Sequence, residues 1–402
     1  MLLPQDFRGA SPSSLRSSVQ ALLAAYSVAL VFRGTASLQA ILLLSAFLLL
    51  LFDRRDALGI AWKDARWALG PLLLFSCWIF ALCGFWREPP LRSWDPGGWN
   101  VQQPWFSLDQ WRRDIAQPMI ALLCGWWAFR EEGARRWLFL IQGGLIFLLA
   151  AKGLHQFFLG EIVDGLLQRG TLQIRGFSRD NIFFSYVLLL LTPGALWLVV
   201  QFRGRRFSWL PILVLLALVF LNKRRGTWAA VYVEFLVLAL GWRRRHLAVF
   251  LLGTLLLGSA AYHLRPGWFQ RNYDFQRTGR VTILKDYPAL AAEAPITGVG
   301  FGKDTVVKNY WHRIYQHAHN TFLNRLLELG WPGLAFWVAA LAVYAFRFLR
   351  GWTQDPAARI GLAFLLAFCV RNLTDDVWIA SNAELFWFQI GVLMPPRPES
   401  PR

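Results

Sequence analysis

Residues 182–202 read IFFSYVLLLLTPGALWLVVQF, an apolar run without a single Asp, Glu, Lys or Arg. A helix needs about 20 such residues to cross the hydrocarbon core of a bilayer. The run therefore predicts a transmembrane helix. Similar runs follow one another along most of the chain, separated by short polar turns.

The composition of the chain also fits a lipid environment. Of its 402 residues, 56% are hydrophobic and 16% are charged, whereas soluble domains carry about 25% charged residues. Many of the 22 tryptophans flank the apolar runs, as in the aromatic belts of membrane helices. The four cysteines lie within or beside these runs and form no Cys-x-x-Cys pair, so we interpret them as buried apolar side chains.

We predict an all-α polytopic membrane protein with about 12 transmembrane helices, the first of which is a span and not a cleavable signal peptide. An even number of spans places both termini on one side of the membrane. Besides 182–202, the predicted spans are 19–32, 38–52, 67–85, 115–129, 137–154, 207–221, 227–242, 246–264, 330–348, 360–369 with its flanks, and 380–394.

Arginine-rich turns set the expected orientation, because short cytoplasmic segments carry an excess of Lys and Arg. These turns are 54–55, 130–136, 203–206, 243–245 and 347–350, together with the N-terminal tail. The long segments 86–114, 156–181 and 265–329 then face the periplasm. The predicted organisation is 1–264 for the first nine helices, 265–329 for a large periplasmic loop, and 330–402 for the last three helices and a cytoplasmic tail.

The formal net charge of +18 does not indicate nucleic-acid binding, because the basic residues lie between apolar spans and form no contiguous soluble patch. The predicted periplasmic segments carry about as many Lys and Arg as the cytoplasmic ones, against the usual bias. Positive charge on the translocated side indicates an anionic substrate.

Three periplasmic stretches carry residues suited to chemistry. The first, Asn222-Lys223-Arg224-Arg225-Gly226-Thr227-Trp228, is a cationic hinge between two spans. Its guanidinium groups can snorkel to the interface, bind a phosphate, or pair with a carboxylate such as the intramembrane Glu234.

The second stretch opens the large loop with Arg280 and continues to Pro295-Ile296-Thr297-Gly298-Val299-Gly300-Phe301-Gly302. Its glycine run is either a plain turn or an array of N–H groups for a phosphate. The residues after Pro288 predict a short helix with proline near its first turn, and 319–329 predict a second helix with an apolar side. We expect both helices to lie over the membrane face.

The third stretch is Gln316-His317-Ala318-His319-Asn320-Thr321-Phe322-Leu323, close to Arg313. Histidine is the side chain best suited to accept a proton near neutral pH. A structural hydrogen bond and a zinc site are the alternatives, although this His-x-His pair has no evident third or fourth ligand nearby.

Taken in order, these motifs resemble the bacterial O-antigen ligase and polymerase superfamily of inner-membrane proteins. The matching features are an Arg-Gly pair that opens a helix, an Arg-x-x-x motif followed by an aromatic or aliphatic residue at the start of the large loop, Pro-x-x-Gly-x-Gly, and His-Asn-x-x-Leu followed by Glu-x-Gly-x-x-Gly. They cover roughly residues 220–335. Two departures are Leu284, where an aromatic residue often stands, and Lys-Arg before Arg225, where serine is common.

The resemblance implies a fold similar to the C-type, metal-independent glycosyltransferases, and transfer of a glycan from undecaprenyl pyrophosphate without a cofactor. Motif by motif, it implies that His319 is the general base and that Arg225 and Arg280 bind the pyrophosphate, with Arg224 as a further candidate. Supporting roles are expected for His317, Asn320, Arg313, Arg175, Arg179 and Glu328.

The expected chemistry needs no metal, because two guanidinium groups can meet the charge that develops on a leaving pyrophosphate. No Asp-x-Asp pair appears in the periplasmic loops to hold Mg²⁺. Asp375-Asp376 is the adjacent acidic pair there, and the nearby Arg371 predicts an ion pair. One-step attack by an acceptor hydroxyl that His319 deprotonates inverts the anomeric centre.

Loop charge favours one member of the superfamily. Lipid A–core is a polyanionic acceptor, and further periplasmic arginines stand at 87, 92, 112, 113, 169, 175 and 179. We therefore expect an O-antigen ligase in the Gram-negative inner membrane, whose partners are the lipid-linked donor, lipid A–core and membrane lipids. An O-antigen polymerase and a protein O-oligosaccharyltransferase remain alternatives. A lipid-linked glycan transporter would instead carry charges within its spans and broken helices in repeated halves.

Overall fold

The computed structural model describes the chain over fourteen stretches, to which the structural statements below refer. These are 14–32, 35–53, 57–83, 104–159, 161–163, 166–168, 177, 181–202, 207–222, 224–241, 252–253, 280–302, 318–378 and 381–395.

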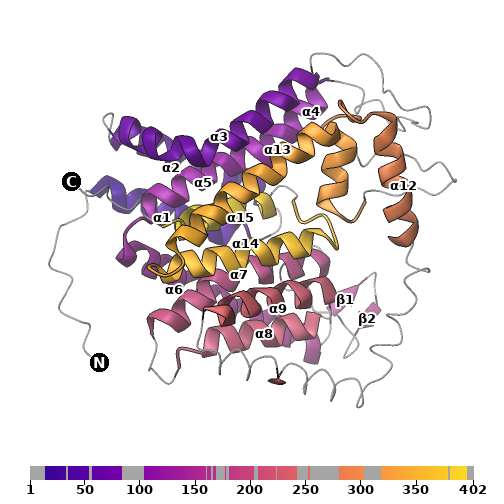
Figure 1. Cartoon of the computed structure of the whole chain (residues 1–402). Helices are drawn as coiled ribbons and strands as arrows, with labels where there is room; N and C mark the ends of the chain where they lie inside the picture. Colours follow the sequence, from indigo (N-terminus) through magenta and orange to yellow (C-terminus); the bar gives the residue numbers. More distant parts are fainter. Residues whose placement is uncertain are drawn as a thin grey trace.

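The described residues form a bundle of long helices (Figure 1). In chain order these are α1 (Ser14–Ala29), α2 (Ala36–Asp53), α3 (Ala57–Cys83), α4 (Pro104–Trp111), the π-helix η3 (Arg112–Ala116), α5 (Gln117–Ala128), α6 (Glu132–Leu159), α7 (Asn181–Gln201), α8 (Leu210–Asn222), α9 (Arg225–Leu240), α12 (Arg280–Glu293), α13 (Thr321–Gly351), α14 (Pro356–Asn372) and α15 (Ser381–Leu393).

One hairpin departs from the all-α expectation. Strands β1 (Glu161–Val163) and β2 (Leu166–Gln168) pair antiparallel, with Glu161 opposite Gln168. Between them the sequence reads Asp-Gly, a pair that favours tight hairpin turns. The hairpin lies in the segment 156–181, for which the sequence predicts no regular structure.

Every predicted span except 246–264 coincides with a described helix, and that span lies outside the described residues apart from 252–253. By length and composition, three described helical segments can cross a membrane, and three further apolar segments are shorter. The first set is Glu132–Gln156, Ile182–Gln201 and Thr321–Gly351, and the second is Ala36–Leu51, Leu69–Leu82 and Leu210–Asn222. These helices indicate a membrane protein, while the count of about 12 spans stays a prediction.

The centre of the bundle is α15, which is buried from Asn382 to Leu393. It packs against α5, while α14 packs against α9 and α13 against α3. The outer helices expose large apolar side chains instead, such as Leu148 on α6 and Leu213 on α8. Lipid does not penalise such exposure, so this distribution fits a bundle with an apolar surround.

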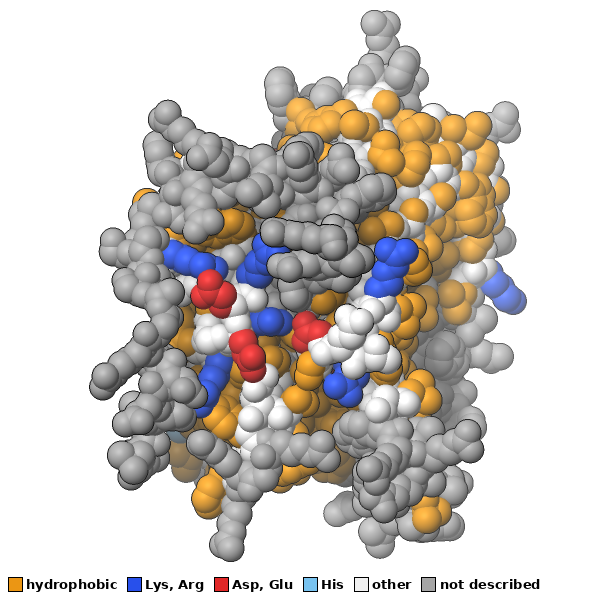
Figure 2. All heavy atoms as spheres, turned by 60° about the vertical axis from the view of Figure 1, so that its left-hand side comes forward, with side chains coloured by type: hydrophobic (Ala, Val, Ile, Leu, Met, Phe, Trp, Pro, Cys, Tyr) orange, Lys and Arg blue, Asp and Glu red, His pale blue; other side chains and the backbone are white. Residues whose placement is uncertain are grey.

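Ion pairs gather three of the predicted cytoplasmic segments at one end of the bundle. Arg16 lies 2.6 Å from Glu131, and Arg135 lies 3.8 Å from Asp355 in the turn after α13. Figure 2 brings the left-hand side of Figure 1 forward and shows basic and acidic side chains gathered among apolar ones.

The described part of the large loop consists of α12, the segment 294–302 and the first turns of α13. Helix α12 packs on α13 through an apolar cluster that includes Ile283, Tyr287 and Leu327. It begins at Arg280, so the expectation of a helix that starts near Pro288 is wrong. Pro288 lies on the exposed side, where water can satisfy the carbonyl group that proline leaves without a donor.

Candidate functional site

The first turn of α13 is fixed by its capping residue. The Asn320 side-chain oxygen accepts hydrogen bonds from the backbone N–H groups of Phe322 (3.0 Å) and Leu323 (3.2 Å), as an N-cap residue does. Its amide nitrogen donates to the carbonyl oxygen of Leu373 at 3.4 Å. Asn320 therefore joins the start of α13 to the turn that follows α14.

His319 lies immediately before this cap in a strained backbone conformation. Its φ of 49° is the one positive φ of a non-glycine residue in the described part of the chain. Such a conformation costs about 1–3 kcal/mol and persists only where the surrounding structure enforces it. The side chain is 42% exposed. The surrounding structure therefore enforces a strained backbone at His319 and leaves its imidazole accessible.

Asp375 orients this imidazole. Its Oδ1 lies 3.1 Å from His319 Nδ1. Burial by itself raises the pKa of Asp375, but the hydrogen bond from His319 and the nearby Arg371 guanidinium outweigh burial and hold the pKa well below its ordinary value. A carboxylate can only accept, so Nδ1 carries the hydrogen and Nε2 is the basic nitrogen of the ring.

Arg371, at the end of α14, connects this pair to α9. Its side chain is 3% exposed, and Nη2 lies 3.4 Å from Asp375 Oδ2. Its Nε donates to Thr227 Oγ1 at 3.2 Å, and its guanidinium carbon lies 4.8 Å from the ring centre of Tyr186. The ion pair that the sequence predicted between Arg371 and the acidic pair is confirmed.

The Arg-Gly pair opens α9 directly against Arg371. A Cβ atom on Gly226 would lie 2.9 Å from Arg371 Nη1, so only glycine fits there without displacing the guanidinium. The preceding Arg225 is exposed, and Arg224 at the N-cap position is half-buried. The structure therefore brings the predicted Arg-Gly motif and the predicted histidine motif to the same segment, 371–375.

Asp376 is held in a second set of hydrogen bonds. Its Oδ1 accepts from Thr321 Oγ1 at 2.8 Å, and its Oδ2 accepts from Asn324 Nδ2 at 2.6 Å. The two carboxylates of the acidic pair thus have different partners. Asp375 faces the histidine, whereas Asp376 fastens the first turns of α13 to the end of α14.

The glycine run is a structural joint and not a phosphate cradle. Three of its N–H groups are already used: that of Gly298 by the carbonyl of Ala294 (2.9 Å), that of Gly300 by the carbonyl of Glu328 (2.7 Å), and that of Gly302 by Glu328 Oε1 (2.8 Å). The plain-turn alternative is therefore the correct one, and the turn packs on α13.

Glu328, which the sequence predicts as a supporting residue, forms a hydrogen bond with this glycine turn. Besides accepting from Gly302, it forms a buried ion pair with Arg325. The Arg325 guanidinium lies over the ring of Phe301 at 4.6 Å and 3.9 Å from Asp114 in η3. Glu328 therefore supports the backbone around the site.

The remaining predicted residues divide into two groups. Arg280 is the first residue of α12, but its side chain lies outside the described residues, as do Arg175, Arg179, Arg313 and His317. Glu234 is fully buried, and its Oε1 accepts from Thr192 at 2.9 Å. Among the described residues, no group of three or more His, Cys, Asp or Glu side chains could hold a metal ion.

The sequence indicates Asp375 and Arg371 only as an ion pair and does not single out Thr227 or Tyr186. The available signal was the acidic pair four residues after an arginine, at the end of an apolar run. It gave no indication that Asp375 would reach a histidine 56 residues earlier in the chain.

Comparison with known proteins bears on the same region. Residues 209–338 match a family model described as O-antigen ligase. The match includes α8, α9 and α12, and it ends within α13, so it includes Arg225, Arg280 and His319. A search of curated proteins returned no match.

Proposed function

This chain belongs, through residues 209–338, to the O-antigen ligase and polymerase superfamily, and on that premise we propose that it is an O-antigen ligase. It is then a glycosyltransferase that moves O-antigen polysaccharide from undecaprenyl pyrophosphate to a sugar hydroxyl of lipid A–core. The reaction takes place at the periplasmic face of the Gram-negative inner membrane. The observation that carries the proposal is the His319–Asp375 contact, which Arg371 joins to the Arg225-Gly226 start of α9.

His319 acts as the general base. Nε2 takes the proton of the acceptor hydroxyl while that oxygen attacks the anomeric carbon, and the bond from this carbon to the pyrophosphate oxygen breaks. Asp375 holds the imidazole in the tautomer with a basic Nε2 and stabilises the imidazolium that forms. Because the attack occurs in one step from the face opposite the leaving group, the anomeric configuration is inverted.

The arginines meet the charge of the leaving group. Arg225 is exposed at the start of α9 and precedes Gly226, which packs against the buried Arg371. One guanidinium group can bind two phosphate oxygens at once. In a site shielded from water, such groups stabilise negative charge that would otherwise require a metal ion. We assign the same role to Arg280 and Arg224, and supporting roles to Arg175, Arg179, Arg313, His317 and Asn320.

The positive charge of the periplasmic loops favours a ligase within the superfamily. Lipid A–core carries phosphate groups, and Coulomb attraction raises the local concentration of an anionic acceptor beside a cationic surface. Among the predicted periplasmic arginines, Arg112 and Arg113 are described. Both lie in η3, and each forms an ion pair with Asp109.

The test is transfer by purified protein in detergent with EDTA present. Undecaprenyl-pyrophosphate-linked O-antigen and lipid A–core are supplied together, and each is also supplied alone. The proposal predicts glycosylated lipid A–core only in the complete mixture. Longer lipid-linked chains from the donor alone would indicate a polymerase. Transfer that EDTA stops and Mg²⁺ or Mn²⁺ restores would contradict the arginine mechanism.

A further inference from the structure

Helix α9 has two faces with different surroundings. Thr227, Ala230 and Glu234 are fully buried and belong to the face that packs into the bundle. Arg225, Trp228 and Tyr232 follow one another at i, i+3 and i+7, so they share the opposite face. The outward face of α9 therefore begins with a cation and continues with aromatic rings.

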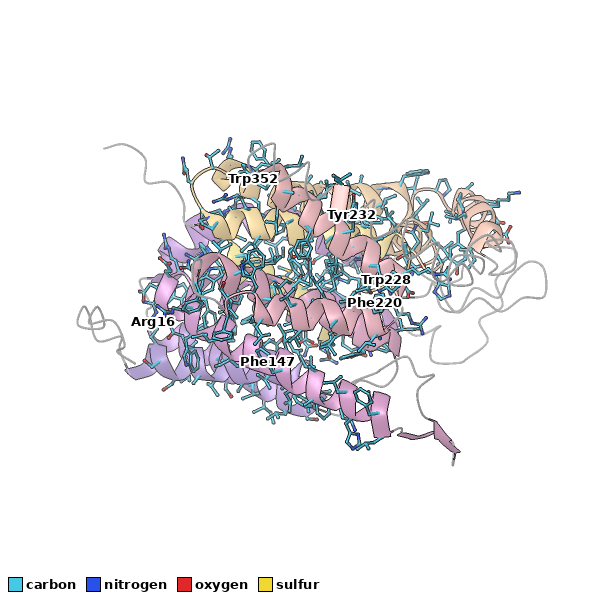
Figure 3. The ribbon with its side chains drawn as sticks, turned by 90° about the horizontal axis from the view of Figure 1, so that it is seen from below. Arg16, Phe147, Phe220, Trp228, Tyr232 and Trp352 are labelled. Carbon is cyan, nitrogen blue, oxygen red and sulfur yellow. The ribbon has the colours of Figure 1, made fainter. Side chains whose placement is uncertain are left out.

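The rings form an aromatic platform, which we define as Phe220 of α8 with Trp228 and Tyr232 of α9. The rings of Phe220 and Trp228 stack with an interplanar angle of 4° and centroids 5.7 Å apart. Trp228 Nε1 donates to the carbonyl oxygen of Val219 at 2.8 Å, which fixes the indole. Phe220 is 51% exposed and Tyr232 is 39% exposed. Figure 3 labels all three residues on the α8–α9 side of the bundle.

The order of these groups matches an amphiphile with an anionic head. Seven residues of helix advance about 10 Å along the axis, so the platform extends from Arg225 toward the middle of the bundle. A pyrophosphate held at Arg225 is covalently bound to its hydrocarbon chain. The first part of that chain must therefore leave the site along the surface next to Arg225, where the platform offers flat apolar area.

We infer that the aromatic platform binds the polyprenyl chain of the donor while Arg225 binds its pyrophosphate. The inference rests on the proposed function for the identity of the lipid. The platform then raises affinity for the donor without touching the reacting atoms. It also selects a lipid-linked pyrophosphate over a soluble sugar nucleotide.

The test compares two donors that carry the same glycan pyrophosphate, one on undecaprenol and one on a single isoprene unit. We expect Trp228→Ala to raise KM for the undecaprenyl donor about tenfold or more, because burying an aromatic side chain is worth more than the free energy of a tenfold change in affinity. KM for the short donor should be unchanged. Trp228→Phe should restore most of the affinity for the long donor.

The matched control is Phe147→Ala, which removes a ring of α6 that is 40% exposed and lies apart from α9 (Figure 3). It should change neither KM. An equal loss for both donors in Trp228→Ala would overturn the inference, because the residue would then support the fold or the pyrophosphate site. Unchanged use of the long donor would overturn it as well.

A binding measurement separates this inference from the proposed function. Native mass spectrometry of the purified protein with undecaprenyl pyrophosphate alone requires no transfer. The inference predicts that Trp228→Ala weakens this binding even if the protein proves to be a polymerase. If Trp228→Ala instead removes bound phosphatidylglycerol and leaves undecaprenyl pyrophosphate bound, the platform is a phospholipid site and the inference is wrong.

Discussion

The side chains of His319 and Asp375 approach to 3.1 Å although 56 residues separate them in the chain. Arg371 also contacts Thr227 and Tyr186, so one buried guanidinium joins α9, α7 and the turn after α14. Neutralising Asp375 or removing Arg371 would leave the other group buried without its charge partner. The ion pair between Arg371 and Asp375 therefore affects both the orientation of His319 and the position of α9.

Replacing Asp375 by asparagine tests the orientation of the imidazole. The introduced amide can present its N–H group to Nδ1 of His319 and thereby favour the tautomer that carries its hydrogen on Nε2, which cannot act as a base. We expect Asp375→Asn to lower kcat by roughly 10²–10⁴-fold with little change in donor KM. Asp109→Asn, at an exposed ion pair on α4, is the control and should keep wild-type kcat. Normal turnover in Asp375→Asn would remove the dyad from the mechanism.

The same carboxylate predicts a pH dependence of stability. Its folded-state pKa lies below its ordinary value, so its contribution to stability is present above the unfolded pKa of about 3.9 and is lost as the pH falls through the folded pKa. The difference in Tm between the wild type and Asp375→Asn should therefore shrink as the pH falls below about 4. Thermal unfolding in detergent measures it. A difference that persists at low pH would show that the native carboxyl group is not ionised.

At the scale of elements, the joint between the glycine run and α13 sets the shape of the site region. Gly298 and Gly330 both have positive φ, at 63° and 68°. A Cβ on Gly330 would lie 2.5 Å from the carbonyl oxygens of Pro295 and Ile296, and one on Gly298 would meet the Glu328 backbone. The two predicted motifs thus pack backbone against backbone, which explains why each contains glycine.

Gly330→Ala should therefore destabilise the protein by more than the roughly 1–3 kcal/mol of a residue held in a sparsely populated backbone conformation, because backbone atoms must also move. Gly144→Ala on α6 is the control, since no atom lies within 4 Å of the added methyl group. Alanine is the better helix former, so this variant should be as stable as the wild type or slightly more so. Thermal unfolding compares the two. If Gly330→Ala were as stable as the wild type, the close backbone packing between the glycine run and α13 would be contradicted.

Sequence predicted the helices well where the signal was local. Apolar runs such as 182–202 depend on consecutive residues, and helix α7 covers that run almost completely. The signal failed at Pro288, where a breaker is tolerated because the freed carbonyl group faces water. His319 and Asn320 are evident as candidates because their motif is contiguous in the sequence. The partnership with Asp375 was not found, because it depends on how the start of α13 meets the end of α14.

At the scale of the whole molecule, the bundle has two chemically different ends. One gathers Arg16, Glu131, Arg135 and Asp355 in ion pairs. The other gathers His319, Asp375, Arg371 and the start of α9. For a transferase that uses a lipid-linked glycan, the second end must face the compartment in which the glycan is exposed.

Cysteine labelling tests this orientation. In a variant with the four native cysteines replaced, Lys285→Cys on α12 and Glu132→Cys on α6 are both exposed positions. A membrane-impermeant thiol reagent added to spheroplasts should label the first and not the second. Labelling of both after the membrane is permeabilised is the control. The reverse pattern in intact spheroplasts would place the site in the cytoplasm.

The most direct test of the central claim is the turnover of His319→Ala. Transfer from undecaprenyl-pyrophosphate-linked O-antigen to lipid A–core is followed in EDTA, and donor binding is measured separately. We predict a loss of roughly 10²–10⁴-fold in kcat, with donor binding retained. His155→Ala, at an exposed histidine of α6, should transfer like the wild type. Wild-type turnover in His319→Ala would contradict the account, because the base would then have to be a different group.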